Sequence, residues 1–108
     1  MPLVKQGHIT LAVVPKNVAI NGHIFYIKVN NLTLRDQLMQ WLKLRNIETR
    51  THYEPLHATK IGTSVGTAVG NLSVTHHTVK ALIRLPLYNT MKDEEQDDVV
   101  TAIYDFFK

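Results

Sequence analysis

The fold is decided by residues 23–53, HIFYIKVNNLTLRDQLMQWLKLRNIETRTHY. The stretch opens with β-branched and aromatic residues, His23–Val29, which favour a strand. Within this strand Phe25, Ile27 and Val29 occupy every second position and therefore share one face. We expect that face to pack inward, so the pattern indicates a core strand rather than an RNA-binding sheet with exposed aromatic rings.

A helix is predicted to follow the strand after Asn30 and Asn31. Thr33 is the expected N-cap, and Asp36 lies in the first turn, where the helix dipole favours a negative charge. Asn46 lies where a helix often ends in a left-handed residue. An apolar stripe with helical spacing runs along one side of this helix, formed by Leu34, Leu38, Trp41 and Leu42.

The segment from Ile47 to Tyr53 is predicted to form another strand. Ile47 and Tyr53 lie on one face with the threonines between them, while Glu48, Arg50 and His52 lie on the other. Strand, helix and strand together form a crossover connection. Such a connection should be right-handed, and it leaves room for a further strand between its two strands.

Residues on either side extend this unit. The N-terminal residues Met1–His8 are predicted to be a tail, and Ile9–Val14 a strand. The elements expected after residue 53 are a small-residue loop at Ala58–Asn71, a helix at Leu72–Leu82 capped by Ser73, a strand at Ile83–Leu87 and a final helix capped by Thr90.

The final helix carries its acidic residues where the helix dipole is positive, at Asp93, Glu94 and Glu95. Its buried face is predicted to consist of Val99, Val100, Ile103, Phe106 and Phe107. The predicted order of elements is therefore β-β-α-β-α-β-α. Helices on one face of a small mixed or antiparallel sheet bury these apolar faces most economically, so the expected fold class is α+β.

Length and composition limit the possible functions. The 108 residues match one ordinary domain, and no boundary or repeat divides residues 1–108. The net charge of +3 is a weak basic excess with scattered lysines and arginines, so we expect no nucleic-acid partner. The absence of cysteine excludes disulfides and thiolate metal sites. The lack of cysteine also fits a cytoplasmic protein. No signal peptide or membrane span is expected.

Candidate site residues gather at the end of the predicted strand Ile47–Tyr53. They are His52, Tyr53 and His57, with Arg50 nearby, in a segment whose turn contains Pro55. Histidine can donate, accept or titrate near neutral pH, and tyrosine offers a hydroxyl on a rigid ring. Such a set suits a phosphorylated or hydroxylated ligand. The alternative is an ordinary strand-to-loop junction with exposed histidines and a core tyrosine.

Two other kinds of site can be considered from the residue types, a metal site and a nucleophilic lysine. His52, His57, His76 and His77 could supply zinc ligands, but neighbouring residues of a helix point about 100° apart, so only one of the last two could join. We therefore expect no metal site. The interior lysines are predicted to be solvated, so none is expected to act as a nucleophile.

Six short runs in this order resemble a known family. They are Gly22-His23-Ile24-Phe25-Tyr26-Ile27, Arg35-Asp36-Gln37-Leu38, Asn46-Ile47, His52-Tyr53-Glu54-Pro55-Leu56-His57, Leu85-Pro86-Leu87-Tyr88 and Asp93-Glu94-Glu95-Gln96. Together they resemble the C-terminal domain of DegT/DnrJ-type sugar aminotransferases, over roughly Ile9 to Lys108. These enzymes use pyridoxal phosphate to place an amino group on nucleotide-linked keto-sugars. The segment Ala58–Asn71 departs from the family pattern, being richer in glycine.

The resemblance implies the small C-terminal domain of a fold-type I aminotransferase. It implies that His52, Tyr53, His57 and Arg50 face the sugar, in a pathway such as lipopolysaccharide synthesis. It also implies that the Schiff-base lysine and the cofactor contacts belong to a large domain outside these residues. We therefore expect no cofactor and no catalytic residue in this chain, and no transaminase activity from it alone. The alternative is a non-catalytic module that binds a nucleotide-sugar or a protein. A homo-oligomer is also expected, because the face that would meet the large domain is uncovered.

Overall fold

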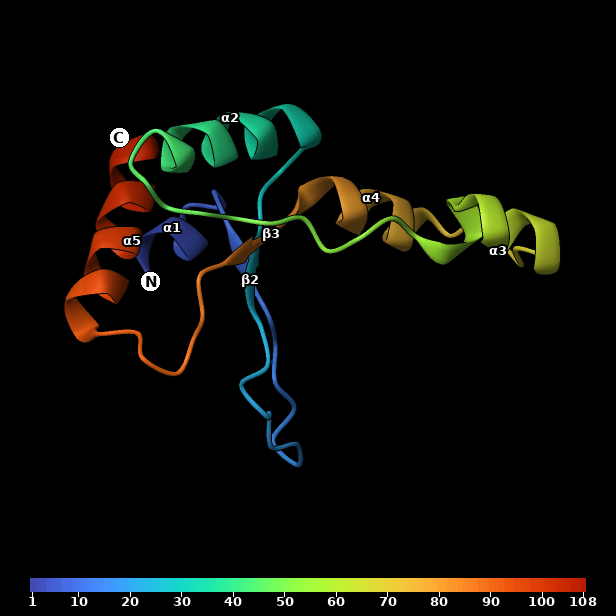
Figure 1. Cartoon of the computed structure of the whole chain (residues 1–108), viewed down its shortest axis with the longest axis horizontal. Helices are drawn as coiled ribbons and strands as arrows, with labels where there is room; N and C mark the ends of the chain where they lie inside the picture. The colour runs from blue at the N-terminus through green and yellow to red at the C-terminus, as the bar shows by residue number, and fades with distance from the viewer.

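The computed structural model describes residues 1–108 and contains one three-stranded antiparallel sheet in the order β1-β2-β3 (Figure 1). The strands are β1 at Thr10–Leu11, β2 at Phe25–Lys28 and β3 at Leu82–Leu85. Leu11 pairs with Ile27, and Ile27 pairs with Ile83, so these three side chains share one face of the sheet. This confirms the predicted strand at His23–Val29, with shorter ends.

Helices cover the apolar face of the sheet. They are α1 at Pro2–Lys5, α2 at Leu32–Lys43 and α5 at Asp93–Phe106. Their buried residues form one hydrophobic cluster with the sheet, which includes Leu3, Leu38, Leu42, Val99 and Ile103. On the opposite face Tyr26, Lys28 and Arg84 remain only partly buried. The predicted α+β class, with helices on one face of a small antiparallel sheet, is therefore confirmed.

The first long helix, α2, follows the predicted stripe but not the predicted cap. Leu38 and Leu42 are completely buried, and Asn46 has the left-handed backbone expected at the helix end, with φ of 59°. The N-cap is Asn31, whose side-chain oxygen accepts a 2.8 Å hydrogen bond from the Leu34 N–H. Thr33 lies inside the helix, so that prediction was wrong. Asparagine and threonine both cap well, and here the strand ends early enough for Asn31 to serve.

The final helix, α5, begins at Asp93 and has the predicted acidic first turn. Its cap is Lys92, not Thr90, and the Lys92 N–H donates a 2.8 Å hydrogen bond to Glu95 Oε2. Ala102 is buried instead of Val100, because the helix turns towards α2. Trp41 of α2 donates from its Nε1 to the Ala102 carbonyl oxygen at 2.8 Å, which fixes the two helices to each other.

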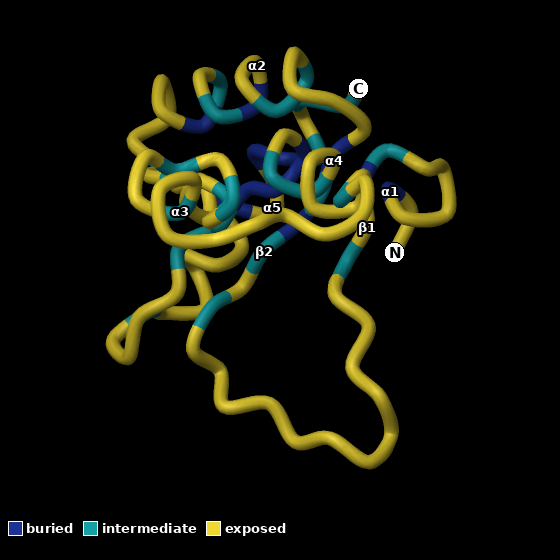
Figure 2. Tube along the Cα trace, turned by 90° about the vertical axis from the view of Figure 1, so that its right-hand side faces the viewer, coloured by how far each residue is buried: buried dark blue, intermediate teal, exposed yellow.

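The N-terminal segment differs from its prediction in two ways. Met1–His8 is not a tail, because α1 forms there and buries Leu3 in the core. The strand expected at Ile9–Val14 pairs with β2 through only two residues. Beyond Leu11 the chain leaves the sheet and forms an exposed loop that ends at β2 (Figure 2). The residues that follow Leu11 are exposed, so no burial of their side chains stabilises further pairing with β2.

The predicted strand at Ile47–Tyr53 is absent. This extended segment makes a single antiparallel bridge, between Arg50 and Arg84 of β3, with backbone N···O distances of 3.1 and 2.7 Å. The sheet strand β3 thus lies between β2 and this segment, as the crossover allowed. A full strand does not form because both faces of the segment are polar after Ile47, so burial cannot stabilise it.

A projecting segment, residues 52–72, includes the predicted loop at Ala58–Asn71, which contains a short helix at Lys60–Val65 and is irregular from residue 66 onward. We call residues 52–72 the arm (Figure 1). It contains the 3₁₀ helix η1 at Leu56–Ala58 and the α-helix α3 at Lys60–Val65, and leads into α4 at Ser73–Ala81. Ser73 is the first helical residue of α4 and not its cap, which is Leu72. The radius of gyration is 15.7 Å, compared with about 13 Å for a compact domain of this length, and the arm contributes to the difference.

A membrane crossing would need a longer and more apolar helix than any in this structure.

Candidate functional site

The predicted site residues lie where the chain leaves the sheet and enters the arm. Arg50 is held by its backbone bridge to β3, but its side chain is three-quarters exposed and forms an ion pair with Glu48. An exposed pair of this kind adds little to stability. The Arg50 guanidinium is therefore accessible from solvent, and another anion can replace Glu48 as its partner.

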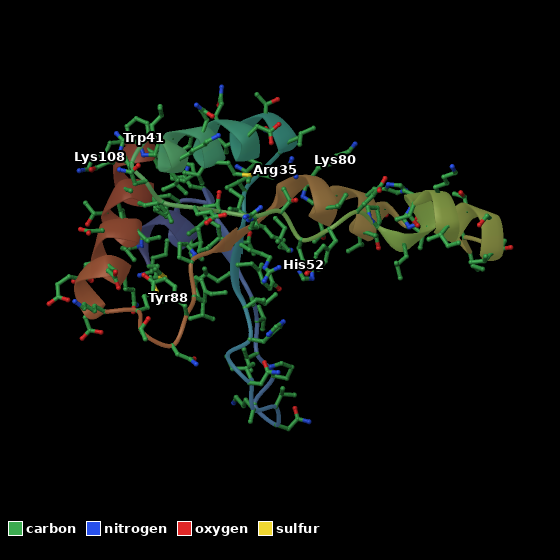
Figure 3. The ribbon with its side chains drawn as sticks, viewed as in Figure 1. Arg35, Trp41, His52, Lys80, Tyr88 and Lys108 are labelled. Atoms are coloured by element: carbon green, nitrogen blue, oxygen red, sulfur yellow. The ribbon has the colours of Figure 1, made fainter.

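His52 lies at the base of the arm (Figure 3). The Tyr53 ring is next to it. Their ring centroids are 5.1 Å apart, and both side chains are exposed. Tyr53 has φ of 61°, a left-handed backbone that a bulky residue rarely adopts. The alternative to a ligand site expected a core tyrosine here, and that part is wrong, because Tyr53 is 73% exposed. The pair presents a ring nitrogen and a phenol hydroxyl to solvent.

His57 has a different neighbour. It belongs to η1, and its Nε2 atom lies 3.2 Å from Nε2 of His76 in α4. The two rings meet edge to face with centroids 4.8 Å apart. The structure thus brings His52 to Tyr53 and His57 to His76, instead of gathering all the predicted residues around one ligand. Their roles in binding remain predictions.

An open groove of about 870 Å³ runs between residues 45–50, the end of β3 and α5. Of the predicted site residues, Arg50 lines this groove, and His52, Tyr53 and His57 do not. Three arginines and four carboxylates line it, namely Arg45, Arg50, Arg84, Glu48, Glu95, Asp98 and Asp105. Sequence reasoning did not identify this groove, because its walls come from three segments far apart in the chain.

Tyr88 and Glu95 form the end of this groove that lies nearest the start of α5. The backbone N–H of Lys92 holds the pKa of the Glu95 carboxyl below its usual value, with a smaller contribution from the Tyr88 hydroxyl. Partial removal from water raises the pKa of the Tyr88 hydroxyl, and its hydrogen bond to Glu95 acts in the same direction. Near neutral pH the groove therefore contains an ionised carboxylate beside a neutral phenol.

A family model and a curated relative match nearly the whole chain. The model of the DegT/DnrJ/EryC1/StrS aminotransferase family matches residues 4–104. A pleiotropic regulatory protein from Geobacillus stearothermophilus is 32% identical over 99 residues, which cover 91% of this chain and 27% of that protein.

Solved structures share the fold. DesV from S. venezuelae, solved in complex with a ketimine intermediate, has a TM-score of 0.83 and 23% identity; the match covers 96% of this chain and 28% of DesV. A DegT DnrJ EryC1 StrS aminotransferase from Brucella abortus has a TM-score of 0.82 and 22% identity, covering 97% and 27%. The chain thus spans little more than a quarter of the proteins that it matches.

Proposed function

Because the chain belongs to the DegT/DnrJ/EryC1/StrS aminotransferase family, we propose that its residues act as the small domain of a sugar aminotransferase. The extent of the matches supports this proposal, since nearly the whole chain aligns with little more than a quarter of each relative. In this proposal a large aminotransferase domain is the partner, and the complete enzyme acts in the cytoplasm. A homo-oligomer is proposed as well.

The residues described here do not fit pyridoxal phosphate, the cofactor implied by the family. A lysine that forms a Schiff base must be desolvated or lie beside another cation to be reactive at neutral pH. No lysine of this chain is buried, and the core contains no buried polar or charged side chain. We therefore propose that the chain alone performs no transamination. Measurable transfer of an amino group to a keto-sugar nucleotide by the purified 108-residue protein would contradict this.

The proposed substrate is a nucleotide-linked keto-sugar, of the kind used in lipopolysaccharide or related polysaccharide synthesis. The observation that carries this proposal is the exposed His52–Tyr53 pair at the base of the arm. Its ring nitrogens and phenol hydroxyl can exchange hydrogen bonds with sugar hydroxyls, and the guanidinium of Arg50 can pair with a phosphate. His57 is proposed to contribute from η1, through the ring atoms that do not face His76.

Amide chemical shifts measured during a titration with a nucleotide-sugar test this assignment. We expect saturable shifts centred on His52–His57, and we expect them to weaken strongly in the His52→Ala variant. Tyr53→Phe keeps the ring and removes the hydroxyl, so it should weaken binding less. His23→Ala is the matched control, because His23 is also an exposed histidine but lies in the loop before β2.

Two results would count against this site. If saturable shifts persist unchanged in His52→Ala, the ligand binds at another site. If no shifts occur at millimolar nucleotide-sugar, the isolated chain does not bind this ligand. Equal shifts with the free nucleotide and the nucleotide-sugar would instead support the second candidate function, a binding module that recognises the nucleotide without reading the sugar.

A further inference from the structure

A pair of histidines connects the arm to the helix that follows it. His57 lies in the middle of η1, and His76 lies in the second turn of α4, 19 residues later in the chain. Their Nε2 atoms are 3.2 Å apart, and the two ring planes are nearly perpendicular. His57 is half-buried and His76 is exposed, so the gap between them opens to solvent on one side.

From this geometry we propose that His57 and His76 form a binding site for a borderline-soft divalent cation, with Zn²⁺ as the preferred ion. Zinc binds histidine nitrogen at about 2.0–2.1 Å with tetrahedral angles, which places two ligand nitrogens about 3.3 Å apart. The observed 3.2 Å separation of the two Nε2 atoms is close to that value. The two nitrogens are therefore already separated by about the distance that one zinc ion needs, and the rings must turn so that both Nε2 lone pairs face the ion.

The same distance also allows a direct hydrogen bond between the two rings, in which one Nε2 donates and the other accepts. Binding of an ion replaces that hydrogen bond. The donating histidine moves its proton to Nδ1, and both Nε2 lone pairs then face the metal. Two neutral imidazoles undergo this exchange without net proton release.

The chain supplies two ligands and no third. No group of three or more histidine, aspartate or glutamate side chains is close enough to hold an ion. Water fills the remaining positions, which makes the site open and exchangeable rather than structural. Imidazole ligands suit zinc, copper and nickel, and they do not suit magnesium or calcium, which prefer oxygen. The ion links η1 to α4 and so restrains α3, which lies between them.

Isothermal titration of the untagged 108-residue protein with ZnCl₂, repeated with NiCl₂ and MgCl₂, tests the proposal. We expect saturable binding of zinc and nickel and none of magnesium. In a parallel NMR titration, the ring resonances of His57 and His76 should move before those of the other histidines. His57→Ala and His76→Ala should each abolish the saturable heat.

His77→Ala is the matched control, because His77 is exposed and adjacent to His76 but points about 100° away from it around the helix. It should bind zinc like the unmodified chain. Far-UV circular dichroism confirms that each variant keeps its helices. The proposal is overturned if the unmodified chain shows no saturation at millimolar zinc, or if His57→Ala binds as tightly as the unmodified protein. Neither result depends on nucleotide-sugar binding, so this inference stands apart from the proposed function.

Discussion

The packed unit and the arm use the same apolar residue types with opposite results. In the packed unit, formed by the sheet with α2 and α5, Leu38 and Leu42 are 0% exposed. In the arm Leu56 is 81% exposed, Ile61 68% and Val65 77%. Burial of a leucine side chain stabilises the folded state by roughly 1.5–3 kcal/mol. Within this chain, the leucines of the packed unit are buried and the apolar residues of the arm are not.

The difference shows that the two regions are stabilised in different ways. Long-range burial orders the packed unit, where the strands and helices come from both ends of the sequence. Local geometry orders the arm. The Thr59 hydroxyl caps α3 by accepting a 3.0 Å hydrogen bond from the Gly62 N–H, and the absence of a side chain at Gly62 lets η1 approach α3.

Truncation of a leucine should separate the two regions most clearly. Leu38→Ala removes a fully buried side chain and leaves a cavity, which should lower the free energy of unfolding by about 2–5 kcal/mol. Leu56→Ala is the matched truncation in the arm and should change it by less than about 0.5 kcal/mol. Urea denaturation followed by circular dichroism measures both. If both variants lost a similar free energy of unfolding, Leu56 would have to be packed in solution, and the two regions would not differ in this way.

The approach of η1 to α3 provides a second test. A Cβ atom at Gly62 would lie 1.7 Å from the Leu56 carbonyl oxygen, so Gly62→Ala forces the two elements apart. Overpacking of this kind costs about 1–3 kcal/mol, and here the cost should be confined to the arm. Hydrogen exchange should become faster at residues 56–66 and stay unchanged in α2 and α5.

Gly66→Ala is the control for that variant, since its Cβ would lie 3.2 Å from the Gly62 carbonyl oxygen and needs only a slight adjustment. It should leave hydrogen exchange in η1 unchanged. If Gly62→Ala destabilised α2 and α5 as strongly as the arm, the two regions would have to unfold as one unit.

The cap of α2 tests how much the packed unit also depends on local contacts. Asn31→Ala removes the acceptor for the Leu34 N–H and should cost about 1 kcal/mol. Thr33→Ala should cost less, because the Thr33 side chain does not cap the helix. Thermal denaturation of both variants measures the difference. If Thr33→Ala lost more stability than Asn31→Ala, Thr33 would be the N-cap, as expected from the sequence.

The smallest expected effect is a dependence on pH at the start of α5. The lowered pKa of Glu95 means that the unfolded chain binds its proton more readily than the folded chain does. Its contribution to stability is therefore present above the ordinary glutamate pKa, and it is lost as pH falls through the lower folded value. Glu95→Gln should flatten the decline of stability in that acidic range, as measured by urea denaturation at several pH values. If the decline of stability at acidic pH is unchanged in Glu95→Gln, other carboxylates cause it.

Sequence reasoning succeeded where one segment determines its own structure. The strand at β2, the stripe of α2 and the acidic first turn of α5 each follow from periodicity or charge within a few residues, and all three are present. On the face of β2 expected to pack inward, Ile27 and Val29 are buried, but Phe25 is 50% exposed. The left-handed Asn46 follows in the same way from its position after a helix. Local signals of this kind need no knowledge of the partners.

The predictions failed where a distant partner or an uncommon local signal decides the structure. Ile47–Tyr53 has strand-forming residues, but β3 offers it one bridge only. The glycines at 62 and 66 favoured a loop, although Gly62 is the residue that lets α3 pack against η1. At the candidate site, neighbouring residues such as His52 and Tyr53 could be grouped from the sequence. The approach of His57 to His76 could not, because it depends on how α4 turns back along the arm.

The stacking of His8 on Phe107, with ring centroids 5.0 Å apart, has a practical consequence. It draws the two ends of the described chain towards each other, and both ends lie on the side opposite the arm (Figure 1). A tag or surface anchor attached at either end therefore holds the molecule with the arm pointing outward. Immobilised binding measurements on this chain can use either end without masking the histidines of the arm.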